Sequence, residues 1–540
     1  MILIVCENSR ISDTVALALG ANTETSTGIH ASTTVTVVTI PEKFIRQIPL
    51  DEMAEGEYPF IPEKFKMAVT MKELERELKP LFREAEEVVF ASDGGADAQA
   101  RFFNICRHFR VGCPRSRMWL NRLSYGAIRG AFHFRETGRH LHRLAQTGLV
   151  SKGMDMLFAY NIDQTCLHIG LPAYHLTRQE VIALEHVGDI CHRFSDIDDD
   201  FNGFTVFLNT GDKDCFAADC SWADEAEAEK ALAEVPVGKT LPATMTVDET
   251  ADFNIRFHTL LTLQMDAYNN LGFMPGKTLK VAQKLYDKGL ISSPMTDCPH
   301  LPAQLRGHME TVFSNVDGYC WEKSDATLNR HAIITLRAAE DGMTTAEVQL
   351  YRLIFNRMGA VVSQKPTRKY ATMRVGIGSL YYTREWELTG LDYDTTPVGK
   401  SETVVEIVDA GVFPDSTASS PVTNDFADVM CSLTSRAAFV DEMLHTGVPF
   451  TRQTDDYGSV LGSLIRKGLL TLDGDDVYLS PEGQYIYDEL VGCEISESLL
   501  TWQFEANDLY GGDQTGRAVM EGFAGTLLAM MELIDPDMEE

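Results

Sequence analysis

The chain has 540 residues, with 47 lysines and arginines against 79 aspartates and glutamates, a formal net charge of −32 at pH 7. The length predicts three or four domains, and a hydrophobic content of 44% is enough for several buried cores, which excludes wholesale disorder. No apolar run approaches the ~20 residues that cross a membrane. Eleven cysteines without a Cys-x-x-Cys pair argue against a disulfide framework or zinc ribbons, so we expect a cytoplasmic protein.

The charge is distributed unevenly along the chain. Residues 101–150 contain ten arginines and a single acid, Glu136, whereas residues 471–540 contain seventeen acids and a single base, Arg517. The acidic balance disfavours nucleic-acid binding over the whole surface, but the basic segment predicts one face suited to polyanions. The alternative is that these arginines form ion pairs with acids of the same chain, and the sequence leaves both possibilities open.

The first 150 residues alternate between strand and helix patterns. They predict, in chain order, a strand over 1–6, a helix over 9–19, a strand over 33–40, a helix over 70–85, a strand over 87–92 and a helix over 98–109. This alternation is typical of a parallel α/β sheet, whose functional sites lie at the carboxyl ends of the strands. The apolar opening is too short for a signal peptide and is interpreted as the first buried strand.

The remaining residues alternate between helical and β-rich regions. Helices are expected over 151–190 and 255–360, strands over 203–210, 371–382 and 402–408, and an acidic helix over 223–233. From about residue 425 the pattern is helical again, with a helix at 459–469, a hairpin at 470–480 and a helix after Pro481. This last succession predicts a winged helix.

Three acidic residues follow predicted strands of the first 150 residues. Glu7 ends the first strand, and Asp93 and Asp97 lie in the glycine-containing turn after the strand at 87–92. If the two strands are neighbours, the carboxylates converge at one edge of the sheet, an arrangement that suits Mg²⁺ and phosphoryl transfer. The same pattern also occurs in ordinary turns without a metal. The run Asp196–Asp200 lacks the spacing of a calcium loop and is interpreted as a solvated turn.

Four segments together carry a resemblance to a known family. They are Glu7 with the Asp93–Asp97 loop, residues 271–291, residues 330–334 (Arg-His-Ala-Ile-Ile) and residues 464–469 (Leu-Ile-Arg-Lys-Gly-Leu). They occur in the family's order and span nearly the whole chain. The sequence resembles the type IA DNA topoisomerases, and the topoisomerase III subgroup fits best.

The resemblance implies a multidomain α/β, α and β fold, in which a TOPRIM-like Rossmannoid domain precedes a toroidal core with a winged-helix-like C-terminal part. It places the TOPRIM-like domain at 1–150, a helical base at 151–200 and 411–540, a β-rich arch at 201–254 and 366–410, and a helical domain with the nucleophile position at 255–365. Members of this family cut a DNA strand with a tyrosine and usually use Mg²⁺.

The family's nucleophile is replaced in this sequence. Where the family has Tyr-Pro-Arg-Thr, the chain has Ser-Pro-Met-Thr at 293–296, so Ser293 stands at the tyrosine position and Met295 at that of the adjacent arginine. The family's Glu-Lys pair is retained only as Glu7-Asn8. A serine reaches less far than a tyrosine and needs activation, and Cys298 has no basic partner in the sequence.

The retained positions define the expected site. The resemblance assigns Glu7, Asp93 and His331 to catalysis, with Ser293 at the former tyrosine position, and Glu7, Asp93 and Asp97 to a weakened Mg²⁺ site. The expected nucleic-acid contacts are Arg101, Arg115, Arg117, Arg122, Asp155 and Asn161.

We therefore expect a catalytically inactive relative that binds single-stranded DNA or a protein partner. We do not expect it to bind a membrane. Two alternatives stay open: an active topoisomerase with an altered active site, and a metal-dependent TOPRIM nuclease.

Overall fold

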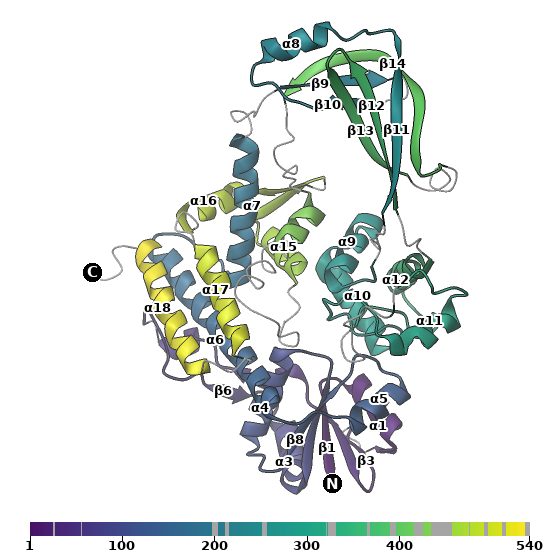
Figure 1. The fold of residues 1–540 in the computed structure, drawn as a ribbon. Helices are drawn as coiled ribbons and strands as arrows, with labels where there is room; N and C mark the ends of the chain where they lie inside the picture. The colour runs from purple at the N-terminus through teal and green to yellow at the C-terminus, as the bar shows by residue number, and fades with distance from the viewer. Residues whose placement is uncertain are drawn as a thin grey trace.

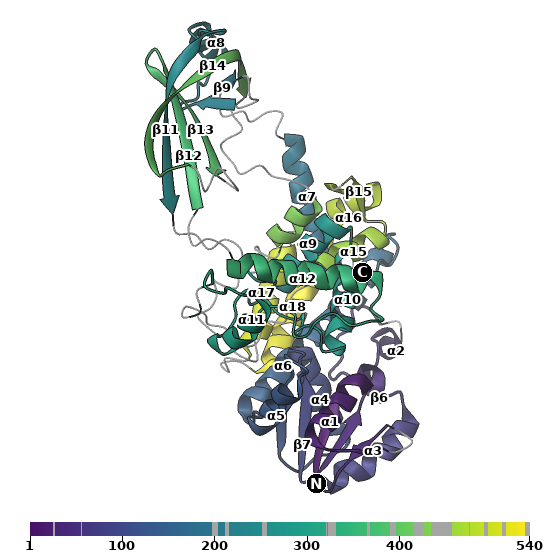
Figure 2. The ribbon, with the colours of Figure 1, turned by 90° about the vertical axis from the view of Figure 1, so that its right-hand side faces the viewer.

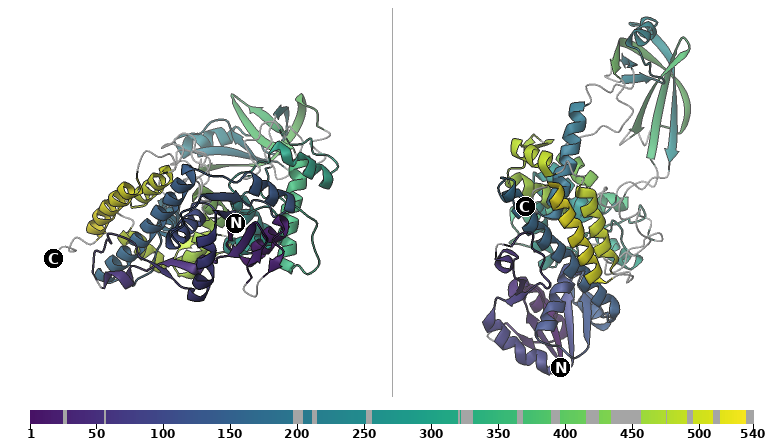
Figure 3. Two further views of the ribbon diagram at one scale, coloured as in Figure 1. Left: turned by 90° about the horizontal axis from the view of Figure 1, so that it is seen from below. Right: turned by 90° about the vertical axis from the view of Figure 1, so that its left-hand side faces the viewer.

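The computed structural model contains an α/β domain, two helical regions and a β-barrel (Figure 1). It describes residues 1–24, 28–55, 57–196, 204–210, 215–250, 256–319, 321, 331–363, 368–388, 396–414, 425–433, 456–474, 476–490, 495–509 and 515–534. Figure 2 and the right panel of Figure 3 show an elongated molecule, with the barrel at the end opposite the N-terminus. Within the described ranges, no helix is long and apolar enough to cross a lipid bilayer.

The α/β domain is built on a six-stranded sheet whose central strand is the first strand of the chain. The strand order is β2 (Thr23–Glu24), β3 (His30–Ala31), β4 (Val35–Thr39), β1 (Ile2–Cys6), β7 (Glu87–Ser92) and β8 (Arg115–Trp119). The pairs β1–β4, β1–β7 and β7–β8 are parallel. Because β1 is covered on both faces, its residues alternate between two cores, as expected for a buried parallel strand.

Helices cover both faces of this sheet. They are α1 (Ser9–Leu19), α3 (Lys72–Glu84), α4 (Ala96–His108) and α5 (Tyr125–His133), and the short elements between them are η1 (Glu42–Phe44), β5 (Ile45–Gln47), α2 (Asp51–Ala54) and β6 (Met67–Val69). Asn8 caps α1, since its side-chain oxygen accepts a hydrogen bond from the backbone N–H of Ile11 at 2.9 Å. The helix ends at Gly20, whose φ of 75° favours glycine.

The first helical region joins stretches that are far apart in sequence. Its elements are α6 (Arg139–His168), α7 (Arg178–Asp196), α15 (Tyr457–Arg466), β15 (Leu470–Asp473), β16 (Asp476–Leu479), α16 (Pro481–Leu490), α17 (Ile495–Asp508) and α18 (Gly516–Ile534). The antiparallel hairpin of β15 and β16 between α15 and α16 has the order of elements predicted for the winged helix.

The boundary predicted at residue 150 falls inside the continuous 30-residue helix α6, which packs on α4 and on α18. A Cβ on Gly148 of α6 would lie 2.4 Å from the carbonyl oxygen of Ala96, so glycine permits the close contact with α4. Leu50 and the nearby Tyr58 and Phe60 also pack into the core of this helical region. The α/β domain and the first helical region are therefore not separated at a single point of the chain.

The second helical region contains α9 (Leu260–Leu271), α10 (Pro275–Asp287), η2 (Ala303–Leu305), α11 (Arg306–Val312) and α12 (Thr345–Ser363). Its apolar side chains and one face of the α/β sheet belong to the same hydrophobic cluster, which includes Ile4, Val89, Leu285 and Ile333. This shared core fixes the second helical region against the carboxyl ends of β1 and β7.

The β-barrel is formed by two separate stretches of chain. Its closed strand order is β10 (Cys215–Ala218), β13 (Leu380–Leu388), β12 (Arg368–Ile377), β11 (Thr240–Thr250), β14 (Gly399–Pro414) and β9 (Phe204–Thr210), with α8 (Glu225–Ala233) beside it. The single strand predicted at 371–382 is wrong, because Gly378, with a φ of 61°, begins a tight turn between β12 and β13. Strand β14 also continues to Pro414, beyond the predicted end at 408.

Candidate functional site

The candidate site lies where the α/β sheet meets the second helical region. Glu7 follows β1 and Asp93 follows β7, and the parallel register pairs Cys6 with Ala91, so the two strand ends are adjacent. Ser293 follows α10 in the second helical region and approaches the same edge. Glu7, Asp93 and the Ser293 segment therefore meet at this junction.

Ser293 is held by hydrogen bonds to the α/β domain. Its hydroxyl donates to Asp93 Oδ2 at 2.6 Å, and its backbone N–H donates to the carbonyl oxygen of Asn121 at 2.8 Å. The same hydroxyl accepts a hydrogen bond from the backbone N–H of Met295 at 3.2 Å. Only 3% of Ser293 is exposed, so a large ligand reaches its hydroxyl only if the α/β domain and the second helical region separate.

Asp93 is more difficult to ionise than an ordinary aspartate. Its pKa is raised to about 6, mainly by burial and also by the negative charge of Glu7, while the hydrogen bond from Ser293 acts in the opposite direction. The carboxyl therefore titrates near neutral pH, within hydrogen-bonding distance of a hydroxyl.

Glu7 is neutralised by an arginine of the same domain. Arg101 on α4 donates to Glu7 Oε1 through Nη2 at 2.6 Å and through Nε at 3.2 Å. The other carboxylate oxygen of Glu7 accepts a hydrogen bond from the Ser92 hydroxyl at 2.5 Å. Arg101 also pairs with Glu42 at 3.1 Å, so its charge is balanced within the chain.

Asp97 lies apart from the Ser293–Asp93 pair. It lines a cavity of about 350 Å³ together with Arg101, Lys152 and Asp155. Burial raises the pKa of Asp97, while the charges of Arg101 and Lys152 lower it. Within the described residues, no group of three His, Cys, Asp or Glu side chains is placed to hold a metal ion. The three predicted carboxylates thus do not form a cluster. Because the guanidinium of Arg101 already forms an ion pair with Glu7, that carboxylate is not available as a metal ligand, and the residues do not fit Mg²⁺.

Arg117 is a buried part of the acidic edge, and the prediction that it contacts nucleic acid is wrong. Its side chain is fully buried, with the guanidinium 3.6 Å from the centre of the Trp119 ring. It donates to the carbonyl oxygen of Gly94 and, at 2.7 Å, to Gln99 Oε1. Burial lowers its pKa to about 9. Arg117 therefore stabilises the turn that contains Asp93 and Gly94. Its position in a basic segment of the sequence did not predict this role.

Asn161 is also structural rather than a nucleic-acid contact. It is fully buried in α6, where its side chain accepts from the backbone N–H of Phe60 at 2.9 Å and donates to the carbonyl oxygens of Phe60 and Leu157. Asp155 is partly exposed, but it forms an ion pair with Arg178 at 2.7 Å. Asp155 and Asn161 thus stabilise the packing of the first helical region.

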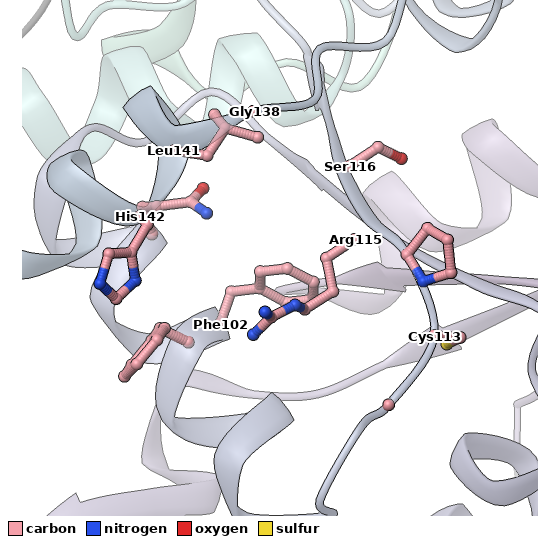
Figure 4. Close-up of a pocket in the computed structure, with 11 residues that line it drawn as sticks. Phe102, Cys113, Arg115, Ser116, Gly138, Leu141 and His142 are labelled. Atoms are coloured by element: carbon pink, nitrogen blue, oxygen red, sulfur yellow. The ribbon is translucent and has the colours of Figure 1, made fainter.

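Arg115 and Arg122 lie at opposite ends of β8. Arg115 is exposed and lines a pocket of about 340 Å³, in which its side chain extends toward Phe102, with His142 nearby (Figure 4). Arg122 follows the strand and lines a different cavity. Other arginines of the basic segment are paired internally, as Arg135 is with Glu87 at 2.8 Å. The expectation of internal ion pairs therefore holds for part of this segment, and polyanion binding by Arg115 and Arg122 stays a prediction.

His331 does not face an open site. It is fully buried, and burial lowers its pKa to about 4, so the ring is neutral at pH 7. Its Nδ1 lies 2.8 Å from the carbonyl oxygen of Ala332. Asp456 caps α15 and accepts a hydrogen bond from Gln264 at 2.6 Å. Asp196 ends α7, but the remainder of the predicted turn at 197–200 lies outside the described residues.

Comparisons with known proteins agree with this architecture. A family model described as DNA topoisomerase matches residues 204–391. The chain is 21% identical to DNA topoisomerase 3 of Vibrio cholerae, over 89% of this chain and 84% of the relative. It is 23% identical to DNA topoisomerase 3 of Bacillus licheniformis, over 83% of this chain and 68% of the relative. It is 24% identical to DNA topoisomerase 1 of Vibrio cholerae over 51% of this chain, but spans only 33% of that relative's length.

A solved structure shares the fold over the whole chain. Full-length topoisomerase I from Thermotoga maritima superposes with a TM-score of 0.70 at 15% identity, covering 100% of this chain and 91% of that one. The family model, the two topoisomerase 3 relatives and the shared multidomain fold together show that this chain is similar to the DNA topoisomerases.

Proposed function

We propose that this chain is a topoisomerase III-like homologue that does not cut DNA and that acts by binding single-stranded DNA or a protein partner. The observation that carries the proposal is that the groups at the acidic edge are paired with one another. The Ser293 hydroxyl donates to Asp93, and Glu7 is neutralised by Arg101. Strand cleavage instead requires an activated nucleophile and cations that are free to stabilise a phosphate.

The side chain next to Ser293 supports the same proposal. Met295 is 37% exposed at the place where the resemblance expects an arginine, so an apolar thioether faces solvent beside the serine. Losing one cation that stabilises a transition state costs ~3 kcal/mol or more, which is over a hundredfold in rate. The combined replacement of a phenol and its neighbouring cation therefore favours a binding role over cleavage.

A plasmid relaxation assay tests this proposal. We expect no relaxation of negatively supercoiled DNA by the chain at low salt with Mg²⁺, under conditions in which DNA topoisomerase 3 of Vibrio cholerae serves as the positive control. Relaxation that is lost in Ser293→Ala would favour the alternative of an active enzyme. That alternative has one observation in its favour, the hydrogen bond from Ser293 to a carboxyl with a pKa of about 6, because this is the geometry of a nucleophile and its base.

The form of binding is tested separately with single-stranded oligonucleotides. Arg115 is the exposed member of the predicted contacts, so we expect Arg115→Gln to weaken binding of a fluorescent oligothymidine and added salt to weaken it further. Arg352→Gln on α12 is a matched control, because Arg352 is exposed outside the basic segment. Affinity that is absent or indifferent to salt would favour a protein partner.

The metal-dependent nuclease is the weaker alternative, because the three carboxylates do not cluster. If Mg²⁺-dependent nicking is observed and persists in a variant with both Asp93→Ala and Asp97→Ala, the nicking does not come from these carboxylates. A cytoplasmic location remains a prediction from the sequence.

A further inference from the structure

A cationic cavity lies between the α/β domain and the second helical region, beside the candidate site. Its volume is about 630 Å³, within the usual range for small-molecule pockets. The α/β domain contributes residues from α1 and from the segment that joins β8 to α5, and the second helical region contributes the end of α10, part of α11 and residues 336–337. The lining residues that carry charge or can carry it are Arg10, Arg122, Asp287, Lys288, His308 and Arg337.

The charge of this cavity is opposite to that of the chain. Four permanent cations face a single lining carboxylate, Asp287, in a protein with a net charge of −32. Lys288 is paired with Glu347 at 2.5 Å, and Arg337 with Glu340 at 3.1 Å, so these two are partly balanced from outside the cavity. His308 is directed through Nε2 toward the carbonyl oxygen of Thr335 at 2.9 Å.

Arg122 and Arg10 have no ion pair among the described residues. Arg122 is partly buried, and burial lowers its pKa, a sign that no nearby carboxylate offsets the cost of removing its charge from water. Arg10 is exposed on α1, and the nearest lining carboxyl, Asp287, has a pKa that burial raises although the hydrogen bond from Gln283 and the charge of Arg10 act in the opposite direction. A guanidinium without an acidic partner binds phosphate well, because its planar donors match two phosphate oxygens.

An aromatic ring is placed next to this cluster. Tyr125, the first residue of α5, lines the same cavity and is 51% exposed. Exposed aromatic rings beside cations are the usual platform for stacking a nucleobase. A cavity of this size with unpaired arginines and a free aromatic face has the components needed for a nucleotide.

We propose that this cavity binds a phosphate-bearing nucleotide, with Arg122 and Arg10 on the phosphates and Tyr125 against the base. The nucleotide is either free or part of a single DNA strand. The bound ligand bridges the α/β domain and the second helical region, and therefore holds closed the junction at Ser293. The site does not depend on whether the chain cuts DNA, since Ser293, Asp93 and Glu7 are not part of the lining.

Isothermal titration of the full-length chain with ADP and with the oligonucleotide dT10 tests the proposal. We expect at least one of the two probes to bind, and its affinity to fall by about tenfold or more in Arg122→Gln, the loss typical of a charge-assisted hydrogen bond. Arg10→Gln should weaken the same probe, whereas Arg352→Gln should not. Binding of ADP identifies a free nucleotide as the source of the phosphate, and binding of dT10 alone identifies a DNA strand.

The variants also separate loss of the site from loss of the fold. Thermal unfolding of Arg10→Gln should match that of the parent, because Arg10 is exposed on α1, so this variant keeps the test valid if Arg122→Gln is unstable. Absence of binding by both probes at low salt would overturn the proposal. Binding that is equal in the parent, Arg10→Gln and the folded Arg122→Gln would overturn it as well.

Discussion

Replacing Asp93 by asparagine isolates the electrostatic cost of the candidate site. The asparagine keeps an oxygen that can accept the hydrogen bond from Ser293, but it cannot ionise. The pKa of Asp93 is about 6 in the folded chain, against an ordinary value of 3.8. For a carboxyl whose folded pKa is raised, the stability contribution is present below pH ~4 and is lost as the pH rises to ~6, with a total of up to ~3 kcal/mol.

We therefore expect Asp93→Asn to gain stability relative to the parent as the pH rises from 4 to 8. The measurement is urea unfolding followed by circular dichroism at pH 4, 5, 6, 7 and 8, with EDTA present to exclude bound cations. The difference between variant and parent should grow by up to ~3 kcal/mol, and most of the change should occur between pH 4 and 6. Asp341→Asn, at an exposed aspartate, is the control for loss of a carboxylate. A difference that is constant with pH, or that shifts toward the parent at pH 8, would refute this reasoning.

Two further predictions concern the packing that positions the site. Asn161→Ala removes three hydrogen bonds to Phe60 and Leu157 and should lower the free energy of unfolding by ~2–3 kcal/mol in urea titrations, whereas Asn270→Ala, at an exposed asparagine, should cost under ~0.5 kcal/mol. Equal losses in the two variants would contradict the structural role of Asn161. Gly148→Ala should force α4 and α6 apart and lower the free energy of unfolding by ~1–3 kcal/mol. The control Gly130→Ala should be neutral or stabilising, because its new Cβ meets no neighbouring element within 4 Å. Melting temperatures of the two variants test this, and an unchanged melting temperature in Gly148→Ala would show that the two helices are not in close contact.

Much of the fold follows from local patterns in the sequence. The strands at the start of the chain and at 87–92 are continuous apolar runs, and the α/β alternation correctly indicates their parallel pairing with both strand ends at one edge, although β2, β3 and β4 pair antiparallel. The hairpin at 470–480 is marked by its turn residues. These features are determined by residues close together in the sequence, and local sequence patterns are therefore sufficient to predict them.

The predictions that fail concern residues whose contacts are with partners distant in the sequence. Arg117 belongs to a basic run in sequence, but Trp119 and Gln99 bury it, so its charge serves the interior rather than a surface. Asn161 binds a segment one hundred residues earlier, which no spacing rule reports. Likewise, the ion pair of Glu7 with Arg101 depends on the position of α4 beside β1. Tertiary packing thus decides whether a polar residue is available to a ligand.

The central claim, that this chain keeps the type IA scaffold without strand cleavage, is tested most directly by trapping a covalent complex. The chain is incubated with a single-stranded oligonucleotide labelled at either end and Mg²⁺, denatured in detergent, and separated by size, beside DNA topoisomerase 3 of Vibrio cholerae as the positive control. We predict that no label remains attached to this chain. A labelled adduct that is abolished in Ser293→Ala would contradict the claim and identify Ser293 as a working nucleophile.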